Sequence, residues 1–351
     1  MTFEKKILAE MPKCYALGMF EGEDASSFLA AVEKDGPIRR FTLDGEPLET
    51  VAPGPGGVMT ITQVPGRKDQ FLATRKFFSP NFGGDDAAIA SYTKQADGSW
   101  SEQILCDLPY VHRFGILKAA DGQLWVLACS IKGGAETGVK DDWRTPGAVW
   151  AAPLSDNLEQ YTADNQLKLT CVANYQVQNH GFGTAPDKSY ALISTAAGVF
   201  RYVPPTTPEG AWDVTCLLVQ PTSDIVATDF DGDGKLEILT FSKFHGDTLA
   251  IWHEGQTRDR YEQVWCDPQK RSFLHALWAA DLNGEKCAVI GNRKDGRDLL
   301  LVRYVDGEYT VDVIDHDLGP ANCMVYRHDG SDYIVAAYRE TDQLALYKVV
   351  E

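Results

Sequence analysis

The sequence feature that most constrains the fold is a strand-turn-strand unit that recurs along the whole chain. Three segments align: residues 5–12 (KKILAEMP), residues 102–109 (EQILCDLP) and, with one extra residue, residues 312–320 (DVIDHDLGP). Continuing this register gives seven units, which begin near residues 13, 57, 110, 178, 222, 273 and 320. Repeats of roughly this period are typical of four-stranded propeller blades.

The two ends of the chain complement each other under this repeat. The seventh unit, residues 320–351, holds only three strands, and one strand over residues 2–11 is left over before the first unit. Pairing of that strand with the incomplete unit closes a ring and removes an open sheet edge. The sequence therefore predicts an all-β, seven-bladed β-propeller that forms a single domain over residues 1–351. A pair of ordinary β-sandwiches is the alternative.

The composition limits which binding partners and which cellular compartment we expect. The chain has 33 Lys and Arg against 50 Asp and Glu, a formal net charge of −17, which repels phosphate backbones and anionic lipids. We therefore expect neither a nucleic-acid nor a membrane partner. The N-terminus shows no secretory signal, and the eight cysteines form no CxxC pair, which favours free thiols and a cytoplasmic location.

One turn in the fifth unit is rich in alternating acids. Residues 229–237 read DFDGDGKLE. Alternating Asp residues place oxygens on one side of a tight loop, and the glycines permit the turn, so the loop suits a hard cation. We predict a structural calcium ion, with a hydrogen-bonded turn without metal as the alternative. The predicted calcium ligands are Asp229, Asp231, Asp233 and Glu237.

This turn resembles the D-x-D-x-D-G hairpins of the FG-GAP and VCBS repeat families, which occur in β-propellers. A weaker copy, residues 281–285 (DLNGE), stands in the sixth unit and lacks the third acid. The resemblance implies the propeller fold and says nothing of an activity.

A register shared by the units points to one functional face. The first strand of each blade lines the centre of a propeller, so residues two or three places into each unit share one end of it. Three of the chain's seven histidines fall there, although a structural core would favour Val or Ile because a buried imidazole needs partners for both nitrogens. The positions hold Tyr15, Met59, His112, His180, Asp224, His275 and Asn322.

Cationic side chains at the ends of the second strands are expected around the same face. In so acidic a chain they form a local reversal of charge, which attracts electron-rich ligands. Two long loops, residues 77–86 and 132–147, are expected above this face, and loops of that length usually carry function. The predicted substrate-binding residues are Arg75, Lys243, His245, Arg293, Arg339, Asn322, Trp143 and Arg144.

These residues favour a metal-dependent lyase or dehydratase that acts on a keto-sugar or a uronate. Neutral imidazoles of His112, His180 and His275 would share a divalent ion, Mn²⁺, Zn²⁺ or Mg²⁺, which would polarise a carbonyl during proton abstraction. The catalytic candidates are these three histidines, Tyr15 and Asp224. The arrangement resembles that of propeller sugar lyases and dehydratases of the aldos-2-ulose dehydratase type, which implies β-elimination.

A second class of function stays open. FG-GAP and VCBS propellers often serve as adhesion or carbohydrate-binding domains, so a non-catalytic propeller that binds carbohydrate or protein is the alternative. The sequence has no Gly-rich phosphate loop and no G-x-S-x-G elbow, which argues against nucleotide cofactors and serine hydrolase chemistry. A small carbohydrate is the expected partner in either case.

Overall fold

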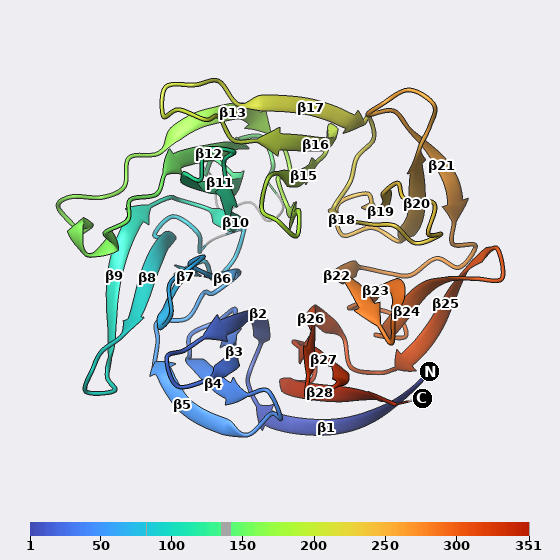
Figure 1. Cartoon of the computed structure of the whole chain (residues 1–351), viewed down its shortest axis with the longest axis horizontal. Coiled ribbons are helices and arrows are strands. Elements are labelled where there is room, and N and C mark those ends of the chain that lie inside the picture. Colours follow the sequence, from blue (N-terminus) through green and yellow to red (C-terminus); the bar gives the residue numbers. More distant parts are fainter. Residues whose placement is uncertain (82, 135–141, 351) are drawn as a thin grey trace.

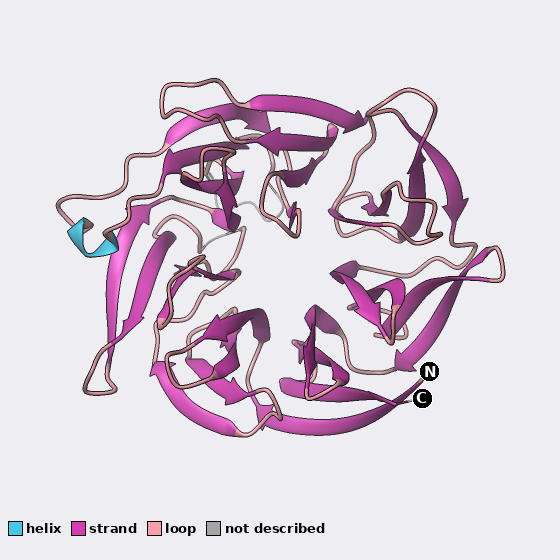
Figure 2. Cartoon of the chain, in the orientation of Figure 1, coloured by secondary structure: helices cyan, strands magenta, loops and turns pink. Residues whose placement is uncertain are grey.

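The computed structural model describes residues 1–81, 83–134 and 142–350. Over these residues the chain forms seven four-stranded antiparallel sheets, arranged as blades around a central axis (Figure 1). One short 3₁₀ helix, Leu158–Gln160, is the only helical element in the described part of the chain (Figure 2). The predicted all-β, seven-bladed propeller is confirmed.

The first four blades run outward from the axis in chain order. Blade 1 contains β2 (Cys14–Glu21), β3 (Ser26–Val32), β4 (Ile38–Thr42) and β5 (Pro47–Ala52). Blade 2 contains β6 (Ile61–Gln63), β7 (Gln70–Arg75), β8 (Ala88–Lys94) and β9 (Trp100–Asp107). Blade 3 contains β10 (Val111–Lys118), β11 (Leu124–Lys132), β12 (Pro146–Pro153) and β13 (Thr170–Gln176). Blade 4 contains β14 (Gly181–Thr184), β15 (Ala191–Thr195), β16 (Gly198–Val203) and β17 (Asp213–Leu218).

The last three blades complete the ring. Blade 5 contains β18 (Asp224–Thr228), β19 (Glu237–Ser242), β20 (Thr248–Glu254) and β21 (Tyr261–Cys266). Blade 6 contains β22 (Leu274–Leu282), β23 (Glu285–Asn292), β24 (Leu299–Val305) and β25 (Glu308–Asp315). Blade 7 contains β26 (Pro320–His328), β27 (Ser331–Tyr338), β28 (Gln343–Val350) and β1 (Thr2–Glu10). Each first strand thus begins within a few residues of its predicted unit.

The ring closes as the sequence predicts. Strand β1 pairs antiparallel with β28, from Thr2 opposite Val350 to Glu10 opposite Gln343, and the two termini lie side by side (Figure 1). Phe3 packs into the hydrophobic core between blades 6 and 7, and Leu8 into the core between blades 7 and 1. The N-terminal strand therefore covers the outer edge of blade 7 and joins two of its cores.

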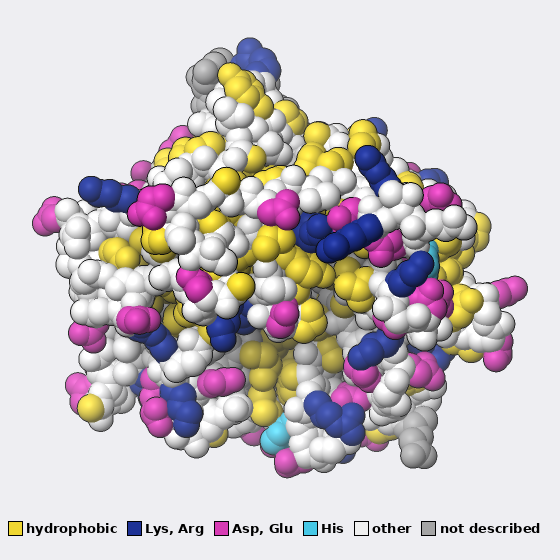
Figure 3. Space-filling view, turned by 45° about the horizontal axis from the view of Figure 1, so that its top comes forward, with side chains coloured by type: hydrophobic (Ala, Val, Ile, Leu, Met, Phe, Trp, Pro, Cys, Tyr) yellow, Lys and Arg dark blue, Asp and Glu magenta, His cyan; other side chains and the backbone are white. Residues whose placement is uncertain are grey.

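Most of the core lies between blades, where the faces of neighbouring sheets meet. In one such layer Leu192 of blade 4 packs with Ile225 and Ile238 of blade 5. Because the sheets stack around the axis, the second and third strands of the blades are mostly buried, and the outermost strands are more exposed. The face in Figure 3 carries charges of both signs, with hydrophobic side chains exposed between them. No helix in the described ranges is long and apolar enough to cross a bilayer.

Candidate metal centre

Four histidines gather at one end of the central axis. His112 lies on β10, His180 just before β14, His245 in the turn after β19, and His275 on β22. The ring centroids are 4.7 Å apart for His112 and His180, and 5.3 Å apart both for His180 and His275 and for His245 and His275. The structure thus brings the three predicted histidines together and adds His245.

A local irregularity of the first strands aims these side chains. In β2, β10 and β22 the ladder with the second strand shifts register across one residue, which is Tyr15, His112 and His275 respectively. Such a β-bulge leaves an extra residue unpaired and re-aims its side chain. In β26 the corresponding extra residue is Ala321, and Asn322 returns to the ladder opposite Ala337. Asn322 is therefore not the equivalent of the histidines, although the register predicts it to be.

Three of the histidines form a group that fits a metal ion. One ring nitrogen each of His180, His245 and His275 lies within 4.8 Å of the other two. Nδ1 of His275 is 2.7 Å from the carbonyl oxygen of Ala321, and Nδ1 of His180 is 3.1 Å from that of Ser223. A carbonyl only accepts, so each Nδ1 carries the proton and each Nε2 carries a lone pair. Carbonyl-anchored imidazoles of this kind are typical of metal-binding histidines.

The group leaves nitrogen atoms without partners. Among the described residues, Nε2 of His180 and Nε2 of His245 are buried and make no hydrogen bond. An unsatisfied buried polar atom costs about 1–3 kcal/mol, and coordination to a cation would remove that cost. Three neutral nitrogen ligands suit Zn²⁺ or Mn²⁺ better than Mg²⁺, which prefers oxygen. The residues present therefore fit a divalent transition metal.

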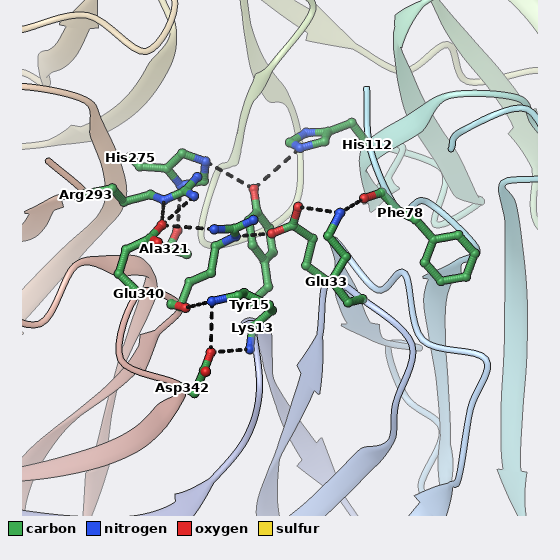
Figure 4. Close-up of polar contacts among 12 residues, drawn as sticks. Lys13, Tyr15, Glu33, Phe78, His112, His275, Arg293, Ala321, Glu340 and Asp342 are labelled. Carbon is green, nitrogen blue, oxygen red and sulfur yellow. Dashed lines mark hydrogen bonds and ion pairs between the residues drawn. The ribbon is translucent and has the colours of Figure 1, made fainter. Parts of the chain in front are cut away.

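His112 has a different environment from the other three. Its Nε2 lies 3.5 Å from Oη of Tyr15, and its ring packs edge-on against Phe77 at 5.2 Å. Figure 4 shows the Tyr15 hydroxyl between the rings of His112 and His275. The register predicts His112 as the third ligand, whereas the group of ring nitrogens that fits an ion contains His245, and the Tyr15 hydroxyl lies between His112 and His275.

Tyr15 sits in a directed hydrogen-bond chain. Its Oη is 3.3 Å from Nε2 of His275, which carries no proton, so the hydroxyl donates to that nitrogen. Nε2–H of His112 then donates to the phenol oxygen, which leaves Nδ1 of His112 as a buried lone pair without a partner among the described residues. Burial raises the pKa of Tyr15, so it remains a neutral phenol at pH 7.

The histidines are held in their neutral form. Burial, with a smaller contribution from Arg113, lowers the pKa of His180 to about 3. Burial likewise lowers the pKa values of His245 and His275 well below their usual range. Neutral imidazoles bind metals, so protons do not compete for these nitrogens near pH 7.

Asp224 and Arg113 supply the charges beside the cluster. Oδ2 of Asp224 lies 3.8 Å from Nδ1 of His180, and burial raises the pKa of Asp224 to about 7. Arg113, next to the bulge in β10, donates from Nη1 to the carbonyl oxygen of Met59 at 3.1 Å and lies over the Tyr15 ring at 5.6 Å. The sequence reasoning missed Arg113, whose position next to His112 in the sequence was the available signal.

The predicted arginines form ion pairs with carboxylates. Arg293 donates to Oε1 of Glu340 at 2.6 Å (Figure 4). Its guanidinium also stacks over Phe273 at 4.6 Å. Arg339 pairs with Glu33, and its Nη1 donates to Glu340 at 3.0 Å. The expected ring of cations is therefore an alternating network in which each guanidinium faces a carboxylate. Arg75 pairs with Glu102 of the outermost strand β9, so the structure does not bring its charge to the cluster.

Aromatic side chains cover the histidines. Phe244 stacks on His245 at 3.9 Å, and Phe273 lies 4.3 Å from the same ring. Trp143, from the predicted long loop, packs edge-on against Phe244 at 4.9 Å. Arg144 donates to Asp142 at 2.7 Å, and Lys243 is exposed. Phe82 and Asp141, which belong to the two predicted loops, lie outside the described residues.

The acidic turn lies at the other end of blade 5. It connects the far end of β18 to β19, whereas the histidine cluster lies beside the start of β18. Asp231, Asp233 and Glu237 come together with His253 of β20, but Asp229 is not in this group. Three of the four predicted calcium ligands are therefore in this group, and His253 is its fourth member.

Comparisons with known proteins support the fold. No family model matches the chain, and no curated protein matches it. Among solved structures, a putative 6-phosphogluconolactonase from Bacteroides fragilis is similar with a TM-score of 0.58 and 12% identity. The match covers 95% of this chain and 90% of that one. At this identity the likeness shows the propeller fold alone, and the FG-GAP and VCBS resemblance rests on one turn.

Proposed function

We propose that the chain is a metal-dependent lyase or dehydratase that acts on a keto-sugar or a uronate. The observation that carries the proposal is the convergence of ring nitrogens from His180, His245 and His275 on one point, where a bound ion would replace the hydrogen bond from Tyr15 to Nε2 of His275. Three protein ligands leave a coordination position for substrate, as in catalytic rather than structural sites. The bound ion would supply Lewis-acid polarisation of the substrate carbonyl.

The side chains around the ion supply the acid and the base of a β-elimination. Nδ1 of His112, which has a free lone pair, takes the proton from the carbon next to the carbonyl. The bond from the β-carbon to its oxygen breaks, and the Tyr15 hydroxyl protonates the leaving oxygen. The Nε2 proton of His112 then passes along the existing hydrogen bond to the Tyr15 phenolate. Proton exchange with water restores the starting tautomer of His112.

The surroundings suit a sugar. Trp143 and Phe244 supply aromatic surface for a pyranose ring, while Arg113, which donates to a backbone carbonyl, favours an oxygen that gains negative charge. The name of the structural neighbour refers to a phosphogluconolactone, so that compound belongs among the substrates tested. A non-catalytic carbohydrate- or protein-binding propeller remains the alternative.

The test uses protein purified without a histidine tag and a panel of keto-sugars, uronates and sugar lactones. The conjugated carbonyl formed by elimination is followed by ultraviolet absorbance, with and without added Mn²⁺ or Zn²⁺. We expect His245→Gln to lose both metal and turnover. Tyr15→Phe should keep the metal and the KM but lose about 10²–10⁴-fold in kcat, the usual contribution of a general acid.

His328→Gln serves as the matched control, because His328 lies at the last residue of β26, at the other end of that strand from Ala321, beside Asp44 and Asp329. It should behave as the wild type. Metal-free protein that binds sugars as well as the metal-loaded protein, with no product from any substrate, would leave the binding module as the function.

A further inference from the structure

The acidic turn of blade 5 and the neighbouring strand β20 form a second cluster, remote from the histidines of the central axis. Cross-strand pairing puts His253 directly opposite Glu237. Nε2 of His253 lies 3.2 Å from Oδ2 of Asp233, 3.4 Å from Oε1 of Glu237 and 4.0 Å from Oδ2 of Asp231. Four potential ligand atoms therefore surround one point.

The three carboxylates are oriented in the same way. Oδ1 of Asp231 accepts from the amide of Asp233 at 3.1 Å, and Oδ1 of Asp233 accepts from the amide of Lys235 at 2.8 Å. Oε2 of Glu237 accepts from the amide of Phe230 at 2.5 Å. Each carboxylate thus uses one oxygen to hold the turn and presents the other to the shared point. Outer contacts that fix a ligand in this way are a feature of built metal sites.

The fourth ligand is anchored similarly. Nδ1 of His253 lies 2.8 Å from the carbonyl oxygen of Glu254, so Nδ1 donates there and Nε2 points to the acids, 3.2 Å from Oδ2 of Asp233. A bound metal ion would replace the Nε2 proton that donates to Asp233.

One carboxylate oxygen of this cluster is buried and makes no hydrogen bond with the described residues. The Glu237 side chain is fully buried at 0% exposure, and its Oε1 accepts no hydrogen bond from the described residues. A buried carboxylate oxygen without a hydrogen bond is costly, and this one faces the point shared with Asp231, Asp233 and His253, whose Nε2 is 3.4 Å away. A cation at that point would satisfy it.

Asp229 takes no part in this arrangement. Its Oδ1 accepts from the amide of Gly232 at 2.8 Å, and its Oδ2 accepts from the amide of Gly234 at 3.1 Å. Both oxygens therefore hold the backbone of the turn, which separates the role of Asp229 from that of the other acids.

We propose that Asp231, Asp233, Glu237 and His253 bind a four-coordinate transition-metal ion of the Zn²⁺ class rather than calcium. Ligand bonds of about 2.0–2.1 Å in a tetrahedron put neighbouring ligand atoms about 3.3 Å apart. The distances from Nε2 of His253 to Asp233 and Glu237, 3.2 and 3.4 Å, are close to that value, and the distance to Asp231, 4.0 Å, is longer. Calcium takes six to eight oxygens at longer distances, and an imidazole nitrogen is a poor ligand for it.

The site has an entry path. A surface groove of about 440 Å³ between blades 5 and 6 is lined by Asp231 and His253 together with Trp265, Tyr304 and Tyr309. An ion reaching the groove would join the β18–β19 turn to β20, and binding to the folded state alone would stabilise the protein.

The test is calorimetric titration of metal-stripped, tag-free protein with Zn²⁺ and, separately, with Ca²⁺. We expect His253→Gln to bind one Zn²⁺ fewer than the wild type, or to bind it at least about tenfold more weakly. His245→Gln, which alters the central cluster, should retain the zinc that His253→Gln loses, so the two sites are read independently. His316→Gln is the matched control, because His316 is an exposed histidine beside Asp317 on another blade.

Asp233→Asn provides a second variant, because Asp233 is exposed and its loss should leave folding intact. It should weaken zinc binding as His253→Gln does. Zinc binding that is equal in wild type, His253→Gln and Asp233→Asn would overturn the proposal. So would calcium binding that is tighter than zinc binding and unaffected by His253→Gln. The proposal would also be overturned if the wild type bound no zinc and protonated His253 alone neutralised the acids.

Discussion

Three of the side chains at the centre of the ring, Tyr15, His112 and His275, are each the extra residue of a bulge in the first strand of a blade. The bulges explain why a simple count along the repeats finds these residues, because each bulge recurs at the same place in its unit. They also explain the anchor of His275, since the bulge in β26 frees the carbonyl of Ala321 to accept from Nδ1.

At this scale the first prediction concerns Asp224. Burial raises its pKa to about 7, so it is neutral below that pH and ionised above it. The ionised carboxylate, 3.8 Å from Nδ1 of His180, stabilises the positive charge of a metal held by that ring. We expect kcat/KM to rise with pH as Asp224 ionises, at or below about 7, because a bound cation favours the carboxylate form. The histidine ligands should keep their metal to lower pH, because burial lowers the pKa of His180 to about 3.

Asp224→Asn should remove this rise and lower the high-pH plateau by about 10–100-fold, the usual effect of losing an outer contact of a metal ligand. Asp281→Asn, at an exposed acid in the neighbouring blade, is the control. An Asp224→Asn profile that keeps the same rise near pH 7 would show that another group titrates.

Sequence reasoning located individual residues unevenly. The shared register found His180, His275, Tyr15 and Asp224, because each unit repeats the strand that carries them. It did not distinguish His245 as a ligand, because that residue lies in a turn whose path depends on tertiary packing. The pairing of Arg339 with Glu33, 306 residues away in sequence, has no local signal.

At the scale of the element, the β18–β19 turn depends on Asp229. Its two carboxylate oxygens accept from the amides of Gly232 and Gly234, and the turn needs positive φ at both glycines, 76° and 88°. We expect Asp229→Ala to lower the free energy of unfolding by about 1–2 kcal/mol, in the absence of metal, because two amides lose their acceptor. Urea unfolding of chelator-treated protein measures this.

Asp281→Ala provides the comparison, since Asp281 stands in the weaker copy of the turn and pairs with exposed Lys286 at 2.8 Å. An exposed ion pair of that kind contributes less than about 1 kcal/mol. Equal stability of Asp229→Ala and the wild type would show that the turn holds without its acid.

At the scale of the molecule, the ring is closed by strand pairing between the two ends of the chain. Deleting residues 2–10 exposes the edge of β28 and removes Phe3 and Leu8 from two cores. We expect a loss of about 2 kcal/mol or more in the free energy of unfolding, from these two partly buried side chains alone. A synthetic peptide of residues 1–11 should restore stability, and a scrambled peptide should not. Unchanged urea unfolding of the truncated protein would contradict closure by β1.

The whole architecture was readable from sequence because it is repetitive. Seven units, an unpaired first strand and an incomplete last unit define the ring without any knowledge of side-chain contacts. The site was readable only in part, because its geometry arises where seven different blades meet. The acidic turn shows the same limit: its acids all lie within residues 229–237, but His253 joins them from the next strand across.

The central claim is that His180, His245 and His275 hold one divalent metal ion, and anomalous diffraction tests it most directly. Crystals of tag-free protein grown with Zn²⁺ or Mn²⁺ should show an anomalous peak about 2.0–2.3 Å from a ring nitrogen of each of the three histidines. Crystals of His245→Gln should lack that peak. Wild-type crystals with no anomalous peak at this position, at saturating metal, would contradict the account.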